Sequence, residues 1–164
     1  MSIIDEKQPV DINLSETQRA RFRIDGDNDR ILELNISDMG IVTRLRDGYP
    51  KLDKLTQKIA SMDDASELSD DEDEKSVRTA VTTMGSAIEE IDNEMRDIMD
   101  SIFDAKVSEV CAPEGTMYDL FNGKYRYEII LEKLLPLYNE NMDKEYEAIS
   151  KRVQKHTSKY TKRK

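Results

Sequence analysis

The sequence of 164 residues has few of the residue types that build tight turns, disulfide bonds and metal sites. It contains six Gly, four Pro, no Trp and one cysteine. A single cysteine excludes an internal disulfide, and no grouping of His and Cys has the spacing of a zinc site. Few Gly and Pro exclude a fold made of many tight turns. With 37% charged and 37% hydrophobic residues, the chain instead suits helices that bury narrow apolar stripes.

Long apolar runs are also missing, and the basic residues are concentrated at the C-terminal end of the sequence. No run approaches the roughly 18 apolar residues that span a bilayer, and residues 1–14 do not resemble a signal peptide, so we expect an intracellular protein without membrane contact. The net charge is −10, but residues 151–164 hold seven Lys or Arg and no acid. That leaves 18 basic against 35 acidic residues in 1–150. Because such a body repels phosphate, nucleic-acid binding is not expected, although the basic end could contact an anionic partner.

Order begins with an alternating pattern that predicts a β-hairpin over residues 21–35. Phe22 and Ile24 alternate with arginines, a polar turn containing Gly follows, and Leu32 and Leu34 occupy every second position after it. A lone hairpin is marginal in water. We therefore expect it to dock on helices or to pair with another chain.

The next segment predicts an amphipathic helix that Asn35 or Ser37 would cap. Its apolar residues recur every three or four positions: Met39, Val42, Leu45, Tyr49, Leu52, Leu55, Ile59 and Met62. Gly48 and Pro50 should kink or briefly break this helix. Residues 63–75 are dominated by carboxylates and predict a solvated acidic loop, with a metal site as the less favoured alternative.

The strongest periodic signal predicts a second helix with a strict heptad seam. The seam residues step by four and three throughout: Val77, Val81, Met84, Ile88, Ile91, Met95, Ile98 and Ile102. Such a seam requires a long partner surface, which either this chain's own helices or an intermolecular coiled coil could provide. Residues 105–123 lose the period and predict a structured loop.

A third helix is predicted from about residue 124, with an apolar face that continues to Val153 and a kink at Pro136. The fold class is thus α+β and predominantly α-helical, with an N-terminal hairpin and three long amphipathic helices. We expect a flexible arm at 1–20, one helical domain at 21–155 that contains the hairpin (21–35) and the acidic loop (63–75), and a flexible basic tail at 156–164.

The sequence contains no complete catalytic or metal-binding motif. Asp25, Asp27 and Asp29 resemble the start of an EF-hand loop, but Arg30 stands where Gly is needed and Ile36 where Glu is needed. His156 has no nearby acid to orient it as a base, Cys111 fits a small buried or half-buried thiol, and no nucleotide-binding motif is present. We expect no enzyme activity, no cofactor and no metal.

The apolar stripes are the features with functional meaning. We expect twelve of their side chains to hold polypeptide, either this chain's own or a partner's: Val81, Met84, Ile88, Ile91, Met95, Ile98, Ile102, Tyr127, Leu131, Leu134, Tyr138 and Met142. Several are methionines, which fill cores by default but also form adaptable surfaces for helices of varied sequence.

Three stretches taken together resemble the small tail assembly chaperones of long-tailed (siphovirus-type) bacteriophages and prophages of Gram-positive bacteria. They are FRIDGDNDRILELNISDMGIVTRL (22–45), IDNEMRDIMDSIFDAKVSEVCAPEGTMYDLFNGKYRYEII (91–130) and KRVQKHTSKYTKRK (151–164). The likeness covers about two thirds of the chain and includes no catalytic fingerprint.

The resemblance implies a protein that escorts the helical, aggregation-prone tape measure protein in the host cytoplasm and helps tail tube protein to polymerise around it. It implies self-association, absence from the mature virion, and in many relatives a longer form made by ribosomal frameshifting. Two alternatives stay open. One is a structural tail component or coiled-coil scaffold, and the other is an adaptor that binds nucleic acid through the basic C-terminal tail.

Overall fold

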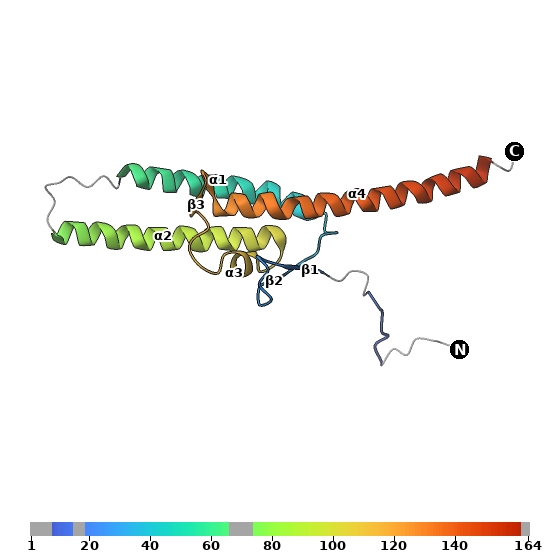
Figure 1. Cartoon of the computed structure of the whole chain (residues 1–164), viewed down its shortest axis with the longest axis horizontal. Helices are drawn as coiled ribbons and strands as arrows, with labels where there is room; N and C mark the ends of the chain where they lie inside the picture. The colour runs from blue at the N-terminus through green and yellow to red at the C-terminus, as the bar shows by residue number, and fades with distance from the viewer. Residues whose placement is uncertain (1–7, 15–18, 66–73, 162–164) are drawn as a thin grey trace.

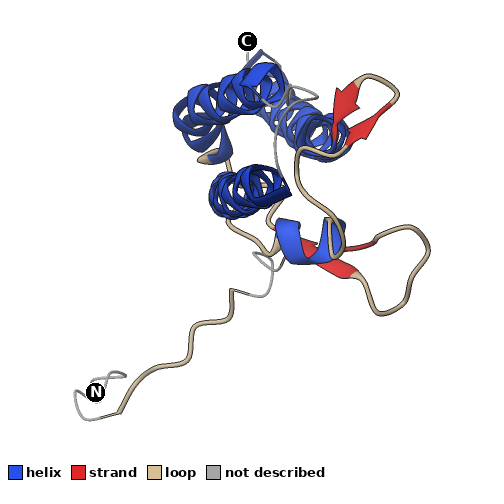
Figure 2. Ribbon diagram, turned by 90° about the vertical axis from the view of Figure 1, so that its left-hand side faces the viewer, coloured by secondary structure: helices blue, strands red, loops and turns tan. Residues whose placement is uncertain are grey.

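A computed structural model describes residues 8–14, 19–65 and 74–161, without the side chains of 63–65 and 156–161. Three long helices, one short helix and two small β-hairpins make up this part of the chain (Figure 1). The expected fold class, α+β and predominantly helical with an N-terminal hairpin, is confirmed. Seen along the helices, the hairpins and the short helix lie outside the long helices (Figure 2).

The predicted N-terminal hairpin is present as β1 (Ala20–Arg23) and β2 (Ile31–Leu34), which pair antiparallel. Leu32 and Leu34 are fully buried, as alternation predicts. The hairpin docks on the chain's own short helix, because Arg30 donates hydrogen bonds to the carbonyl oxygens of Val110 (2.9 Å) and Cys111 (3.2 Å). Arg19, placed in the flexible arm by the sequence analysis, is tied to Asp104 by an ion pair of 3.2 Å.

The first two long helices, α1 (Ile41–Ala65) and α2 (Glu74–Phe103), pack side by side (Figure 1). Both enter the range 63–75 predicted as an acidic loop, and residues 66–73 lie outside the described part of the chain. Glu74 stands in the first turn of α2, where the helix dipole favours a carboxylate. The N-terminus of α1 was predicted too early, because the Asp38 carboxylate instead accepts the N–H of Gly40 (2.8 Å) just before the helix.

The buried face of α1 differs from the predicted stripe. Met39, Val42 and Tyr49 are exposed. The positions directed toward the rest of the protein step by four and three, and they are Ile41, Leu45, Gly48, Leu52, Leu55, Ile59 and Met62. The prediction failed at the start of the helix because a glycine, which carries no apolar side chain, occupies one inward position.

Gly48 also explains why α1 runs through residues 48–50 without the short break that the sequence analysis allowed. A Cβ atom built on Gly48 would lie 2.9 Å from two side-chain carbons of Ile102. The absence of a side chain at Gly48 therefore lets α1 approach α2 closely, and this packing outweighs the cost of Gly and Pro50 in the helix.

The segment between α2 and the last helix is an ordered loop, as predicted, but it contains secondary structure that the sequence analysis missed. It forms α3 (Val107–Cys111) and a hairpin of β3 (Leu120–Phe121) and β4 (Lys124–Tyr125). Asn122 and Gly123, both with positive φ (53° and 80°), make the turn of this hairpin.

The last helix, α4 (Arg126–Thr161), starts beside α1 and continues far beyond the other helices (Figure 1). Asn141 donates to the carbonyl oxygen of Ile36 (3.4 Å) and to the hydroxyl of Ser37 (3.1 Å), which marks the end of the packed part. Residues 156–161, assigned to a flexible tail by the sequence analysis, belong to this helix. No Gly or Pro follows Pro136, so nothing in the sequence stops the helix earlier.

We call the region where α1, α2 and residues 126–142 of α4 pack together the body. Its largest fully buried side chains come from α1, α2, β2 and the segment between α2 and α4: Phe103, Leu32, Leu34, Leu52, Met95, Met99, Ile102, Met117 and Val107. Two parts project from the body: the distal hairpin, formed by residues 57–65 of α1 and 74–90 of α2, and the α4 extension, residues 143–161.

Candidate protein-binding surfaces

The twelve side chains predicted to hold polypeptide divide sharply by burial. Seven are buried in the chain's own core: Ile91, Met95, Ile102, Tyr127, Leu131, Leu134 and Tyr138. Four are half-buried, namely Met84, Ile88, Ile98 and Met142, whereas Val81 is 59% exposed. The buried members contact other parts of the same chain, so surfaces available to another molecule lie on the projecting parts.

Most half-buried and exposed residues of the α2 seam lie where α4 does not cover the pair of α1 and α2. Tyr127, at the start of α4, shares a hydrogen bond of 2.9 Å with Thr56 of α1. The helical pair beyond this point has no cover from α4 (Figure 1). Accordingly, the seam of α2 is half-buried at Val77 and exposed at Val81, whereas Ile91, Met95 and Ile102 are buried.

A groove of about 610 Å³ lies between α1 and α2 where the distal hairpin meets the body, and we call it the hairpin groove. Its apolar lining consists of Met62, Ala87 and Ile91. Lys54 and Lys58 line it from α1, and Glu90 and Glu94 line it from α2. Residues four apart lie on one helix face, so the groove has one basic wall and one acidic wall.

The four wall residues form no ion pair within the described part of the chain. Sequence reasoning did not single them out. The spacing of four between Lys54 and Lys58, and between Glu90 and Glu94, was visible in the sequence, but their facing one another depends on how α1 and α2 are aligned. An apolar floor between walls of opposite charge matches a helix with an apolar stripe and charged flanks.

The α4 extension carries the second apolar surface. Tyr146, Ile149 and Val153 are 57%, 44% and 55% exposed, and they continue the stripe that Tyr138 and Met142 begin in the body. In the body this face of α4 is covered, since Tyr138 is 3% exposed and its ring contacts that of Phe103. The same face therefore changes from core to surface along one helix.

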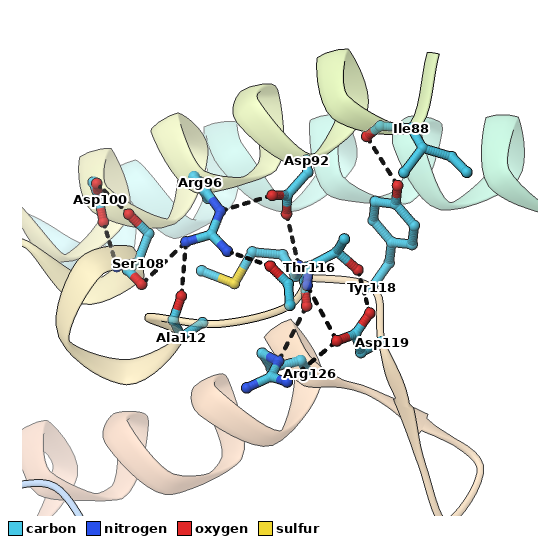
Figure 3. Close-up of polar contacts among 12 residues, drawn as sticks. Ile88, Asp92, Arg96, Asp100, Ser108, Ala112, Thr116, Tyr118, Asp119 and Arg126 are labelled. Carbon is cyan, nitrogen blue, oxygen red and sulfur yellow. Dashed lines mark hydrogen bonds and ion pairs between the residues drawn. The ribbon is translucent and has the colours of Figure 1, made fainter. Parts of the chain in front are cut away.

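A polar clamp holds the loop after α2 against that helix (Figure 3). Arg96 pairs with Asp92 at 2.8 Å, and the other Asp92 oxygen accepts the N–H of Met117 at 2.7 Å. The Arg96 guanidinium also donates to three loop carbonyl oxygens at 2.8 to 3.2 Å: those of Ser108, Ala112 and Gly115. Because its donors are used in these bonds, the clamp has a structural role and fixes the loop on which α4 starts.

A second polar cluster continues the clamp toward α4 (Figure 3). Asp119 accepts hydrogen bonds from the Thr116 hydroxyl (2.6 Å) and from Arg126 (3.2 Å), and the Thr116 bond is the main reason that its pKa is lowered. Tyr118 donates to the carbonyl oxygen of Ile88 at 2.9 Å, and burial raises its pKa to about 12. These groups position the beginning of α4 and the seam at Ile88.

A cleft of about 850 Å³ lies between β2 and the turn that joins α2 to α3. Two of its carboxylates are already bonded within the chain. Asp100 accepts both the N–H (2.7 Å) and the hydroxyl (2.8 Å) of Ser108, and Asp104 pairs with Arg19. The cleft thus offers walls of both charges without an available nucleophile or base at those positions.

Cys111 is half-buried, as the sequence analysis expected. Burial raises the pKa of its thiol to about 11, so the thiolate needed for nucleophilic chemistry or metal binding is scarce at neutral pH. The acidic turn Asp25–Asp29 is held internally, since Asp25 pairs with Arg30 at 3.0 Å and Asp27 accepts the N–H of Asp29.

Comparison with known proteins identifies no relative: no family model, no curated protein and no solved structure matches the chain. Within the described ranges, no helix has both the length and the apolar character needed to cross a bilayer.

Proposed function

We propose that this protein is a phage tail assembly chaperone that binds the tape measure protein in the host cytoplasm and assists polymerisation of the tail tube protein around it. The proposal combines the resemblance of residues 22–45, 91–130 and 151–164 with one observation, the hairpin groove. A tape measure protein is a long helical chain, and a groove with an apolar floor and two charged walls suits the apolar face of such a helix.

The charges of the groove define which helix fits. A client helix that places acids beside Lys54 and Lys58, and bases beside Glu90 and Glu94, would form complementary pairs on both flanks of its apolar stripe. In this proposal the α2 seam packs the body at Met95 and Ile102, and its residue Ile91 lines the groove beside Ala87.

Co-purification with the client provides the main test. We expect a very long coiled-coil reading frame directly downstream of the gene, and we expect its product to co-purify with an affinity-tagged copy of this chain after co-expression. Ala87→Arg would fill the groove with a long charged side chain and abolish co-purification. Ser86→Arg, which adds the same side chain at an exposed neighbouring position, should leave it unchanged.

Both variants should show unchanged thermal unfolding, because neither position lies in the buried core. Loss of client binding in both variants, or in neither, contradicts the groove as the binding site. Mass spectrometry of purified virions tests the chaperone role itself, since the chain should be missing. Its presence in the particle would indicate a structural tail component, and DNA binding that disappears on deletion of residues 151–164 would indicate the adaptor role.

A further inference from the structure

The α4 extension presents an apolar stripe that the chain itself does not cover. Beyond Asn141, no described side chain of α4 is buried, although Tyr146, Ile149 and Val153 are large and apolar. The extension points away from the body, so no other helix in the described ranges lies beside it (Figure 1). Exposed apolar stripes on a projecting helix mark a site of association.

The order of the stripe suits a second copy of the same chain. Met142, Tyr146, Ile149 and Val153 are separated by four, three and four residues, a spacing that reads the same in both directions. In an antiparallel pair, Tyr146 therefore meets Ile149 of the second copy while Met142 meets Val153. Such a symmetric contact uses the same patch on both copies, as twofold interfaces do.

Charge decides the direction of the pair. Acids dominate the first half of the stripe, at Asp143, Glu145 and Glu147, and the following half carries Lys151, Arg152 and Lys155. A parallel pair would place acids beside acids and bases beside bases. An antiparallel pair brings each acidic half beside the basic half of the other copy.

We infer that two copies of this chain associate through antiparallel pairing of their α4 extensions, with Tyr146 and Ile149 at the centre and Glu145 of each copy beside Arg152 of the other. Glu145 and Arg152 form no ion pair within the described part of their own chain. This surface is separate from the hairpin groove, and the inference does not depend on the proposed client.

The interface is small. It contains four apolar side chains from each copy, whereas a standard stable interface uses about 20 to 30 residues a side. We therefore expect a reversible dimer in the micromolar range or weaker, whose population rises with protein concentration. Salt should weaken it, because the flanking ion pairs are exposed.

Sedimentation equilibrium of the full chain, over three decades of concentration up to ~1 mM, tests the inference. The wild type should pass from monomer to dimer. Ile149→Glu, which places a charge at the centre of the stripe, should weaken dimerisation about tenfold or more. Ala148→Glu adds the same charge away from the stripe and should preserve the dimer.

A charge exchange distinguishes the antiparallel pair from any other contact. Glu145→Arg alone and Arg152→Glu alone should each weaken the dimer, because like charges would then meet twice. The double variant Glu145→Arg with Arg152→Glu should recover it. A chain that stays monomeric at every concentration overturns the inference, as does a double variant no better than the singles, or a stripe that binds only the client protein or DNA.

Discussion

The body and its projecting parts are built from the same helices, but the apolar stripes are buried in the body and exposed in the projecting parts. In the body, α1, α2 and the first half of α4 cover one another, and Met95, Met99 and Ile102 are almost completely buried. In the distal hairpin and the α4 extension, similar stripes stay at the surface, with Val81 and Tyr146 more than half exposed. The comparison teaches that an apolar stripe on a helix specifies burial only where a neighbouring helix is present to provide it.

Replacing one isoleucine by alanine in the body and one in the α4 extension should give the largest difference in the free energy of unfolding. Ile102→Ala removes a side chain that is 1% exposed and packs against Gly48, and we expect it to lower the free energy of unfolding by about 2 to 5 kcal/mol. Ile149→Ala, in the α4 extension, should change it by less than ~0.5 kcal/mol. Urea unfolding at low protein concentration, where the chain is monomeric, measures both. Equal losses would contradict the separation of body and projecting parts.

Two ion pairs of the same spacing on α2 sharpen the comparison. Arg96 pairs with Asp92 in the clamp, where the side chains are 21% and 13% exposed, and Arg78 pairs with Glu74 in the distal hairpin, where they are 79% and 83% exposed. Arg96→Gln leaves one carboxylate oxygen of Asp92 and three loop carbonyl oxygens without their donor, so we expect the free energy of unfolding to fall by about 2 to 4 kcal/mol.

Arg78→Gln is the control for this variant. It removes a solvent-exposed pair that contributes about 0.3 to 0.5 kcal/mol. Thermal and urea unfolding of both variants should separate them clearly. A small effect of Arg96→Gln would mean that packing alone holds the loop and that the clamp contributes little.

Replacing a glycine by alanine should destabilise the protein in the body and stabilise it in the distal hairpin. Gly48→Ala places a Cβ 2.9 Å from Ile102 in the body, and we expect a loss of about 1 to 3 kcal/mol from overpacking, partly offset by better helix propensity. Gly85→Ala, in the distal hairpin, meets no atom within 4 Å and should stabilise the protein by about 0.4 to 1 kcal/mol. Unfolding curves of the two variants should move in opposite directions. Stabilisation by Gly48→Ala would show that α1 and α2 are less closely packed there.

The arrangement of elements could be predicted from the sequence where periodicity is strong. Alternation at Phe22, Ile24, Leu32 and Leu34 predicted the first hairpin, and steps of three and four predicted the long helices. The second hairpin was missed although Asn122 and Gly123 carry the strongest short-range signal for one, because its strands have only two residues each.

Features that depend on contacts between distant residues could not be predicted. The inward face of α1 includes Gly48, which a hydropathy pattern cannot mark as buried. The clamp joins Arg96 to carbonyl oxygens 12 to 19 residues later, and backbone acceptors have no sequence signature. The hairpin groove depends on the alignment of α1 with α2, which the contact between Gly48 and Ile102 fixes.

Lowering the pH should reveal the smallest difference in stability between variants of the body and variants of the α4 extension. The pKa of Asp119 in the body is lowered chiefly by the hydrogen bond from the Thr116 hydroxyl. A carboxyl whose pKa is lower in the folded than in the unfolded state contributes stability above its ordinary pKa of 3.8, and this contribution is lost as pH falls through the folded-state value. Urea unfolding at pH 5 and at pH 3 should therefore show a smaller acid-induced loss in Asp119→Asn than in the wild type. Asp143→Asn, at an exposed position of the α4 extension, should lose as much stability between pH 5 and pH 3 as the wild type. Equal losses in the two variants would show that Asp119 does not contribute to the acid sensitivity of the body.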